Sequence, residues 1–439
     1  MEPKMHSVGL LIIGIFSLTS GNRLHHETAL RKKLGIFSVP GGIKETPMVN
    51  AGSPLTITIG LNLLRILQVD EKNAIFTTSV WLRMSWRHKN LVWNSSEYGS
   101  IKELRVNPDR LWVPDIFLIN NAVGSFEVQG ALAKVIVRSD GEVIWANPAI
   151  FKSSCEMDIK YFPFDDQTCT LQFGSMTYNI SSSKIKPASD HVDIKRYIES
   201  GEWKILETQV RDSVEMADEG SYAVITYSIK VRRRVLYYVM NFILPCVLIA
   251  VLTVLVFLLP PESGERISYG ITVILSFTIL LIMLYEKLPV TSSQYPLIAV
   301  YYACTTFQVS IALALCVWVL RFYHHDPPTD ELPRWVKVVV LNWLARLVLL
   351  KNSTDQVRQE LILHSWEELA HSKQRRSKNA LTVVMNSIFK KEEESAKREE
   401  WRIVSTILNR LCLWMFVATG FITFIAVFLG SPRARAMEL

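Results

Sequence analysis

Apolar and polar residues follow two different patterns in the two parts of the chain. Up to about Arg234, short segments of alternating character, such as Leu55 to Leu64 and Tyr222 to Val231, are separated by turn sequences such as Ser139-Asp140-Gly141. Alternation with a period of two is typical of half-buried strands, and many short strands at this spacing favour a sandwich of two sheets. We therefore expect an antiparallel β-sandwich over residues 28–234.

Continuous apolar runs replace the alternation after this point. Each of four runs is long enough for a helix that crosses about 30 Å of hydrocarbon. The runs are Leu236 to Leu259, Ile267 to Leu284, Leu297 to Leu320 and Ile403 to Leu429. They predict three transmembrane helices within 235–320, the second of them at about 265–286, and a fourth transmembrane helix over 403–429.

The segment between the third and fourth runs, 321–402, carries more Lys and Arg than Asp and Glu, which favours the cytoplasmic side. Arg334 to Lys351 is apolar but interrupted by charges, as in an interfacial amphipathic helix. Asp355 to Arg402 is rich in helix formers with opposite charges four residues apart, which predicts a long charged helix leading into the last span. The expected fold class is a multidomain membrane protein, with an extracellular antiparallel β-sandwich, a four-helix transmembrane bundle and a helical cytoplasmic segment.

The first residues have the layout of a cleaved secretory signal peptide. Lys4 precedes an apolar run from Val8 to Leu18 that is too short to span a bilayer, and small residues follow up to Gly21. A signal peptide at 1–21 places the β-sandwich outside the cell, and four spans return the tail 430–439 to the same side. The sequence therefore predicts a multi-pass protein of the plasma membrane with both ends extracellular.

Composition narrows the functional classes. A chain of 439 residues with 49% hydrophobic residues and a mean hydropathy of +0.20 suits partial solvation by lipid. The net charge of +7 includes no long basic block interleaved with aromatic residues, so nucleic-acid binding is not expected. The sequence has no Cys/His cluster with metal-ligand spacing and no Ser/His/Asp, P-loop or paired-carboxylate pattern in a suitable context. We predict no metal site, no cofactor and no enzymatic activity.

One face of the second apolar run carries an ordered series of side chains. Spacings of three and four residues place the series within about 80° on a helix. It consists of Ser268, Thr272, Leu275, Ile279, Ile282 and Glu286. Glu265 precedes it, and about 31 Å of helix separates the two acids, close to the hydrocarbon thickness. Acids at both membrane faces with hydroxyls between them indicate a water-filled path, because acid rings concentrate cations and aliphatic rings gate by dewetting.

A second interpretation of this face stays open. Ser and Thr side chains can bond across packed helices, and the two acids can lie among lipid headgroups. One helix cannot line a pore, so the pore hypothesis requires a ring of subunits. A secondary transporter is disfavoured by the lack of inverted repeats, and a voltage-gated channel by the lack of an arginine-rich span. A non-conducting adhesion or scaffold receptor remains an alternative.

Cys155 and Cys169 are the only two of the six cysteines in the polar half, and thirteen residues separate them. In a secreted domain a bond between them would close a loop, which stabilises the fold by about 3 kcal/mol through loop-closure entropy. Phe162, Pro163 and Phe164 give the loop an apolar tip suited to contact with the membrane domain. A loop of this length carrying Phe-Pro-Phe-Asp resembles the defining loop of the Cys-loop receptors, which are pentameric ligand-gated ion channels.

Further motifs extend this resemblance over nearly the whole chain after the signal peptide, and they are more similar to nicotinic receptors than to glycine or GABA receptors. They include Trp81-Leu-Arg-Met-Ser-Trp86, Trp112-Val-Pro-Asp115, Gly201-Glu-Trp203, Leu258-Leu-Pro-Pro-Glu-Ser-Gly-Glu265 and Leu341-Asn-Trp343. The family's anion channels carry a Pro-Ala insertion before the pore helix, where this chain has Gly264-Glu265. The resemblance implies a subunit of a homo- or hetero-pentamer in the plasma or postsynaptic membrane. It implies that a small-molecule agonist opens the pentamer to cations and that membrane lipids surround it.

The resemblance also maps an agonist site onto the subunit interface, where this chain departs from the family pattern. Nicotinic-type sites hold a quaternary ammonium in an aromatic cage. The mapped positions are Trp81, Arg83, Ile119, Ile144, Met176 and Tyr222. Ile119 and Met176 replace aromatic residues, which weakens ammonium binding about tenfold or more. Three readings follow: an accessory subunit that lends its Trp81 side to another subunit's site, a site for an acidic or apolar ligand, or simple packing of Trp81 and Tyr222.

The resemblance places the coupling between the agonist site and the pore at the domain junction. The residues expected there are Asp70, Glu71, Phe162, Pro163, Arg233 and Pro296. Arg233 could pair with Glu71, although a surface ion pair without a gating role is nearly as good an explanation. Asn94 and Asn179 begin N-x-S/T sequons in the outside domain, so we expect both to be glycosylated.

Overall fold

The structure is a computed structural model that describes residues 23–36, 42–47, 53–123, 133–217, 220–288, 295–324, 336, 339–340 and 381–428. The chain separates into two compact units. The first contains Met1–Asp158, Asp165–Arg234 and Leu288–Val290, and the second contains Ile159–Phe164, Val235–Lys287 and Thr291–Leu439. The predicted signal peptide, the predicted interfacial helix apart from residues 336 and 339–340, and the tail 430–439 lie outside the described residues.

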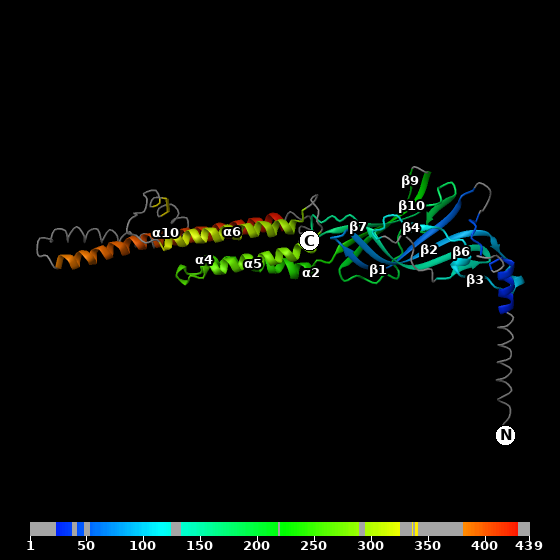
Figure 1. Cartoon of the computed structure of the whole chain (residues 1–439), viewed down its shortest axis with the longest axis horizontal. Helices are drawn as coiled ribbons and strands as arrows, with labels where there is room; N and C mark the ends of the chain where they lie inside the picture. The colour runs from blue at the N-terminus through cyan, green and yellow to red at the C-terminus, as the bar shows by residue number, and fades with distance from the viewer. Residues whose placement is uncertain are drawn as a thin grey trace, which may run out of the picture. The chain divides into compact units, whose positions relative to one another are not determined.

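The first unit contains two β-sheets (Figure 1), which confirms the predicted sandwich. The strands are β1 (Leu55–Asp70), β2 (Ile75–Val92), β3 (Glu103–Val106), β4 (Ile116–Leu118), β5 (Val135–Arg138), β6 (Asp140–Ser154), β7 (Asp166–Ser175), β8 (Ser183–Pro187), β9 (Trp203–Ala217) and β10 (Gly220–Arg233). A six-stranded sheet has the order β3-β5-β6-β2-β1-β8, and a four-stranded sheet has the order β4-β7-β10-β9. Alternate residues along β1, such as Ile57, Ile59 and Leu61, are buried because successive side chains point to opposite faces of a strand.

Pairing between strands is antiparallel with one exception among the described residues, since β8 runs parallel to β1. A helix over 23–33 precedes the first strand, and the alternation analysis did not predict it. Leu30 and Leu34 bury one side of this helix in the core of the first unit, and Arg31 pairs with Glu27 at 2.6 Å. The spacing of four residues in both pairs is the helical signal that the sequence offered.

Two connections tie the sheets of the first unit together. The disulfide between Cys155 and Cys169, predicted from the sequence, joins the residue after β6 to β7 across a Cα–Cα distance of 5.2 Å. The Tyr227 hydroxyl on β10 donates a hydrogen bond of 2.8 Å to the carbonyl of Ile59 on β1. Each connection therefore links the six-stranded sheet to the four-stranded sheet through a buried group.

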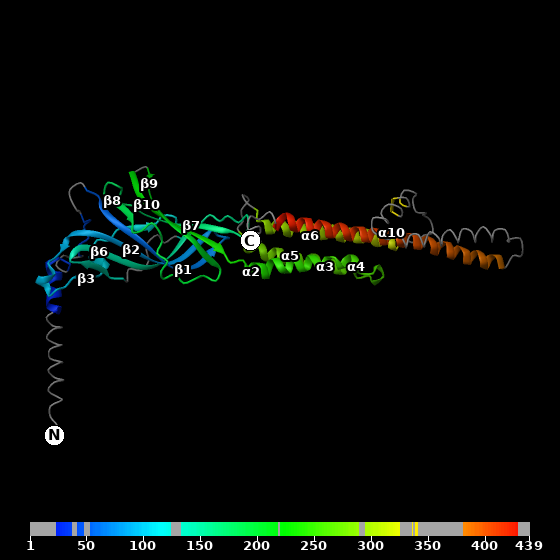
Figure 2. The same ribbon diagram turned by 180° about the vertical axis from the view of Figure 1, so that it is seen from behind.

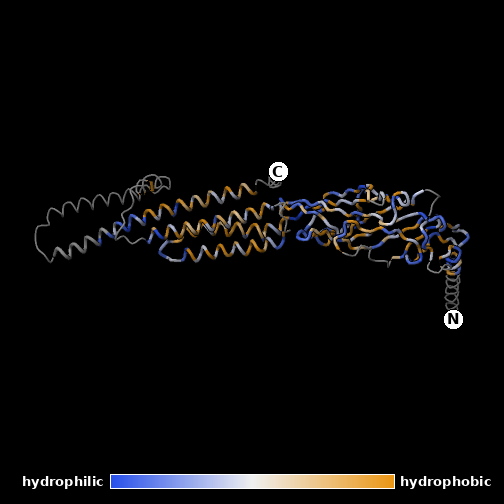
Figure 3. The backbone as a smooth tube through the Cα atoms, turned by 45° about the horizontal axis from the view of Figure 1, so that its top comes forward, coloured by the Kyte–Doolittle hydropathy of each residue, from blue (hydrophilic) through white to orange (hydrophobic). Residues whose placement is uncertain are grey.

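The second unit contains the four predicted membrane spans (Figure 2). By length and composition, the described helices that can cross a membrane are Leu236–Leu258, Arg266–Tyr285, Leu297–Tyr323 and Lys397–Val427. They comprise α2 (Leu236–Tyr238), η3 (Val239–Ile243), α3 (Leu244–Thr253), α4 (Leu255–Leu258), α5 (Arg266–Tyr285), α6 (Leu297–Tyr323) and the end of α10 (Leu381–Phe428). Figure 3 shows that hydrophobic residues dominate these segments.

The first span changes helix type in its first half. Residues Val239–Ile243 of η3 form a π-helix just before Pro245. Proline has no N–H and its ring clashes with the carbonyl four residues earlier, so the backbone widens in front of it. The Tyr302 hydroxyl on α6 donates a hydrogen bond of 2.7 Å to the Phe242 carbonyl within this turn. The irregular turn therefore has a partner from a neighbouring helix.

The last span continues directly from a charged helix. α10 runs without a break from Leu381 to Phe428, so the charged part after 381 leads into the span as predicted, and the part before 381 lies outside the described residues. Trp401 lies where the two parts meet and stacks on Phe322 of α6 at 5.6 Å between ring centroids. Val404 and Ile407 are buried in the same cluster. The base of the last span therefore packs firmly on α6.

Candidate functional site

The predicted stripe on α5 is exposed along its entire length in the single chain. Leu275, Ile279 and Ile282 are 60%, 53% and 55% exposed. Glu265, Ser268, Thr272 and Glu286 are exposed as well. Among the described residues, no helix buries this face, so its hydroxyls and acids stay accessible in the single chain.

The opposite face of α5 holds the helix in the bundle. Val273, Phe277 and Leu284 are buried there. Gly270 lies on the same face, and a Cβ atom at this position would come within 2.5 Å of the Leu313 side chain of α6. Glycine therefore leaves room for the Leu313 side chain between α5 and α6.

The hydroxyls of α5 are oriented by the helix itself. Thr272 Oγ1 donates a hydrogen bond of 2.9 Å to the carbonyl of Ser268. Thr278 makes the same bond to Ile274, also at 2.9 Å. A hydroxyl that donates its hydrogen bond to the backbone presents its oxygen lone pairs outward. The exposed Thr272 oxygen is therefore an acceptor suited to a cation.

Arg233 is the centre of a buried charge cluster in the first unit. Its side chain is 0% exposed, and it donates two parallel hydrogen bonds to Asp165, at 2.8 and 3.0 Å. A third hydrogen bond joins it to Glu71, the partner expected from the sequence. Glu202 lies 4.0 Å away, and the guanidinium lies 4.2 Å from the Trp203 ring centroid. Arg233 and Asp165 are buried and Glu71 is nearly so, so this contact is not at the surface, while its role in gating stays a prediction.

The acids of this cluster differ in their environment. Burial raises the pKa of Glu71 above its ordinary value, and this effect outweighs the attraction of Arg233 and is reinforced by Glu202. Asp70, although adjacent, bonds to Asn73 instead. Its carboxylate accepts hydrogen bonds from the backbone and side chain of Asn73 at 3.0 and 2.8 Å, which lower its pKa. Asp70 therefore shapes the turn between β1 and β2.

Asp165 was not among the residues singled out from the sequence. It carries the two-pronged contact with Arg233 and also accepts a hydrogen bond from Gln167 at 2.5 Å. The signal was available in the Phe-Pro-Phe-Asp motif, whose last residue is Asp165. Because Asp165 and Asp166 are neighbours, only the pairing of β7 with β10 decides which of them faces Arg233 and which faces the exposed Arg232.

The tip of the disulfide loop belongs to the second unit, where it packs on the membrane helices. The Phe162 ring lies 5.0 Å from the ring of Tyr238 in α2. The Lys160 carbonyl accepts a hydrogen bond of 3.0 Å from the N–H of Leu297, which follows Pro296 at the start of α6. Pro163 lines a small apolar pocket together with Leu297 and Val427. The structure thus brings Phe162, Pro163 and Pro296 together.

The predicted agonist-site residues separate into two groups in the first unit. Ile119 follows β4, Met176 follows β7 and Tyr222 lies on β10, and these three strands are neighbours in the four-stranded sheet. Met176 is 68% exposed, whereas Ile119 and Tyr222 are half-buried. Trp81, Arg83 and Ile144 lie on the other sheet, on β2 and β6. The predicted residues therefore form two separate groups in one chain, called half-sites below, and their joining into one agonist site between subunits stays a prediction.

In the half-site on β2, an arginine side chain that the sequence did not indicate lies over the Trp81 ring. The Arg196 guanidinium lies 5.1 Å from the centroid of the exposed Trp81 ring. Asn62, opposite Trp81 on β1, donates a hydrogen bond of 2.9 Å to Asp193 and so anchors the segment that carries Arg196. Arg83 is exposed on the same strand face as Trp81. Two cations therefore flank the aromatic surface that a ligand would meet.

Ile144 does not contribute to this surface in the single chain, because it is only 6% exposed within the six-stranded sheet.

On the other half-site, Asp115 orders the segment around Met176. Asp115 accepts hydrogen bonds from the Ser175 hydroxyl at 2.7 Å and from the Thr177 N–H at 3.1 Å. Sequence reasoning assigned no role to Asp115, although it closes a quoted motif.

The two sequons differ in their accessibility. Asn94 is exposed and caps a short helical turn, accepting a hydrogen bond from the Ser96 N–H at 3.2 Å. Asn179 is half-buried, and its side-chain oxygen accepts hydrogen bonds from Ser181 and Ser182. Asn94 is therefore the more open acceptor for a glycan.

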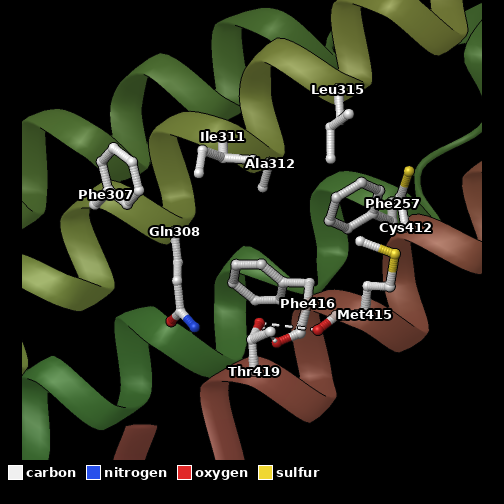
Figure 4. Close-up of a pocket in the computed structure, with 10 residues that line it drawn as sticks. All are labelled: Phe257, Phe307, Gln308, Ile311, Ala312, Leu315, Cys412, Met415, Phe416 and Thr419. Carbon is white, nitrogen blue, oxygen red and sulfur yellow. Dashed lines mark hydrogen bonds between the residues drawn. The ribbon is translucent and has the colours of Figure 1, made fainter.

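A larger apolar pocket of about 280 Å³ opens among the membrane helices (Figure 4). Phe257 of α4, Gln308 of α6, and Cys412 and Phe416 of α10 are among its lining residues. Its polar groups are few, and the Gln308 amide donates a hydrogen bond of 3.2 Å to Thr423. Such a lining suits hydrocarbon rather than an ion.

Comparison with known proteins agrees with this geometry. The profile of the neurotransmitter-gated ion-channel ligand binding domain matches residues 43–235, and that of the neurotransmitter-gated ion-channel transmembrane region matches residues 242–382. The human neuronal acetylcholine receptor subunit alpha-6 is 34% identical over 423 residues, which cover 84% of this chain and 85% of the relative. The human alpha-3 subunit is 40% identical over 70% of this chain and 61% of the relative, and the human alpha-2 subunit is 32% identical over 87% and 84%. The chain therefore belongs to the family of neurotransmitter-gated ion channels that includes the neuronal acetylcholine receptor subunits.

Proposed function

We propose that this chain is a subunit of a pentameric, ligand-gated, cation-selective ion channel of the plasma membrane. The first unit lies outside the cell and receives the agonist between subunits. The second unit spans the membrane four times, and α5 lines the pore. The chain acts as a channel subunit and not as an enzyme.

The exposed stripe on α5 carries this proposal. Every residue of the stripe is exposed in the single chain, whereas residues on the opposite face of α5 are buried. A ring of five such helices would present acid rings at Glu265 and Glu286 and an aliphatic constriction at Leu275. Acid rings concentrate cations, and an aliphatic ring closes a pore by excluding water.

The agonist we propose is not a quaternary ammonium. Ile119 and Met176 provide no aromatic face on one half-site, and Arg83 and Arg196 place positive charge around Trp81 on the other. A cation would be repelled there, whereas a carboxylate or another electron-rich group would be attracted. In a homomeric receptor we therefore favour an acidic or electron-rich agonist.

A second candidate is an accessory subunit that conducts only beside related subunits. The observation that favours it is the missing aromatic surface around Met176 and Ile119, because such a subunit would need no agonist half-site of its own there. Its α5 would still contribute one fifth of the pore lining.

The test begins with a variant that needs no agonist. Leu275→Thr replaces the proposed hydrophobic gate by a hydroxyl, so water should enter the pore and the channel should open spontaneously. The variant is expressed alone in oocytes, its surface amount is measured, and the reversal potential is recorded during sodium and chloride substitution. The wild type is screened in parallel with amino acids, amines, protons and lipids.

Two outcomes separate the candidates. A spontaneous current that follows the sodium gradient, and that loses its selectivity in Leu275→Thr/Glu265→Ala, supports a homomeric cation channel. Current that arises only on co-expression with a related subunit supports the accessory role. A chloride-selective current would contradict the proposed selectivity, and silence under all of these conditions despite surface expression would favour a non-conducting receptor.

A further inference from the structure

The first residue of α5 carries a charge that a cation pore must neutralise or remove. Arg266 directly follows Glu265 at the same end of the helix, but it is only 2% exposed whereas Glu265 is exposed. A guanidinium turned toward the lumen would oppose the attraction of Glu265 for cations. The contacts that hold Arg266 inside the bundle therefore bear on conduction.

Three hydrogen bonds of Arg266 fix its position. Nε donates to the carbonyl of Leu259 at 2.6 Å, and Nη2 donates to the same carbonyl. Nη1 donates to the side-chain oxygen of Asn409 on α10 at 3.1 Å. The Asn409 amide nitrogen in turn donates to the Phe257 carbonyl at 2.7 Å. The Asn409 side chain therefore connects α10 to both α5 and α4.

The end of α4 explains why these groups meet. α4 ends at Leu258 and Pro260 follows, so the last carbonyls of the helix have no N–H of their own turn to bind. Arg266 and Asn409 occupy two of them. The negative end of the helix dipole also favours a cation at this place.

The partners of this cation are neutral. Within the described part of the chain no carboxylate lies at ion-pair distance from Arg266, and the Cys316 thiol is a further polar group beside it. A buried charge held only by neutral acceptors depends strongly on each of them, since losing one leaves part of the charge unsatisfied. Loss of the Asn409 oxygen would therefore drive the guanidinium toward water.

We propose that Asn409 is a positioning residue for ion conduction. By holding Arg266 in the bundle, it leaves Glu265 as the unopposed charge at this end of the pore. This inference rests on the proposed pore function of α5. In a pentamer, loss of the contact would bring five guanidinium groups toward the five Glu265 carboxylates and cancel their attraction for cations.

The experiment measures single-channel currents in the Leu275→Thr background, where no agonist is needed. Asn409→Leu removes both hydrogen bonds at similar volume. The unitary sodium conductance should fall by about twofold or more, and the reversal potential should move toward that of chloride. Asn409→Asp keeps an acceptor for Arg266 and should retain the parental conductance. Thr406→Val changes a polar residue one turn away on α10, whose hydroxyl bonds only within its own helix at Arg402, and should also retain it.

A merely structural role of Asn409 predicts a different result. Lower surface expression or open probability with unchanged unitary conductance in Asn409→Leu would overturn the proposal. In Leu275→Thr/Arg266→Gln, where the charge is absent, Asn409→Leu should not change the conductance, and a further fall there would also overturn it. If Asn409→Leu does not reach the surface, Asn409→Ser, which is too short to reach Arg266, takes its place. Absence of current in the Leu275→Thr parent refutes the pore itself and is recorded before any Asn409 variant is measured.

Discussion

The guanidinium of Arg233 binds Asp165 through two parallel hydrogen bonds of 2.8 and 3.0 Å, with the Arg233 side chain fully buried and that of Asp165 3% exposed. The next residue toward the N-terminus repeats this chemistry at the surface, where Arg232 binds Asp166 at 3.0 and 3.2 Å with its side chain 48% exposed. The two Arg–Asp contacts therefore have the same residue types and similar geometry, but one is buried and the other is exposed.

This pair predicts two very different substitution effects. Arg233→Gln leaves buried carboxylates without their cation and should lower the free energy of unfolding by about 3–5 kcal/mol. Arg232→Gln should change it by no more than about 1 kcal/mol, because water screens the exposed pair. Thermal unfolding of the purified receptor in detergent measures both. Equal effects of the two substitutions would contradict the role assigned to burial.

Glu71 predicts a pH dependence with a defined sign. Its pKa is raised above the ordinary 4.5 mainly by burial. Between the ordinary and the raised pKa the folded chain keeps a proton that the unfolded chain has lost, so this group's contribution to stability falls as the pH rises through that window. Glu71→Gln has no such proton. The stability of this variant relative to the wild type should therefore increase from pH 4.5 upward.

The measurement compares thermal unfolding of the wild type and Glu71→Gln at constant salt, from the ordinary pKa of 4.5 to about three pH units above it. Asp70→Asn is a useful control, because the pKa of Asp70 is lowered below its ordinary 3.8. The contribution of Asp70 is therefore constant over this range, and the stability of Asp70→Asn relative to the wild type should not change with pH. If the stability of Glu71→Gln relative to the wild type does not rise over this pH range, attraction by Arg233 outweighs burial.

His88 predicts a loss of stability in acid. It is 4% exposed, burial lowers its pKa below the ordinary 6.5, and among the described residues neither ring nitrogen has a hydrogen-bond partner. The unfolded chain takes up a proton below pH 6.5 before the folded chain does, so the free energy of unfolding falls as the pH drops through that range. His88→Leu should remove this part of the slope without a large loss of stability at pH 7.5, since no hydrogen bond is broken. An unchanged slope in the variant would show that other groups cause the acid effect.

Thr272 and Thr278 predict the direction in which α5 faces. Both hydroxyls donate to the carbonyl four residues earlier at 2.9 Å, so replacing either by Val perturbs the helix equally. Only Thr272 lies on the proposed pore face, because six residues turn the helix by about 240°. In the Leu275→Thr background, Thr272→Val should lower the unitary conductance and Thr278→Val should not. The reverse ranking would require a different pore-facing side of α5.

The sequence predicted those features that depend on local pattern or on membrane thickness. The four spans were located to within a few residues at most ends, because hydrocarbon thickness sets the length of an apolar run. The disulfide and the Arg233–Glu71 contact were also predicted. The stripe on α5 was derived from helical spacing alone, and its exposure in the structure agrees with that derivation, while its role in a pore remains a prediction.

The contacts that sequence reasoning missed depend on register or on packing between distant segments. Asp165 and Asp166 look equivalent in the sequence, and only strand pairing separates them. Asn409 is one polar residue in a long helix, and nothing local indicates that it reaches Arg266, 143 positions earlier. Arg196 covers Trp81 only because Asp193 anchors its segment beside β1. Such pairings require the coordinates.

The unbroken course of α10 has a mechanical consequence. A helix of 48 residues is about 72 Å long, and a continuous hydrogen-bonded helix resists bending. A tilt of its charged first part is therefore expected to move its membrane-spanning part as well. The stack of Trp401 on Phe322 holds α10 against α6 between these two parts, and Asn409 lies two turns farther along α10. A small tilt of the charged end, caused by a bound partner or a change of charge, would therefore shift Asn409 and with it Arg266 at the start of α5.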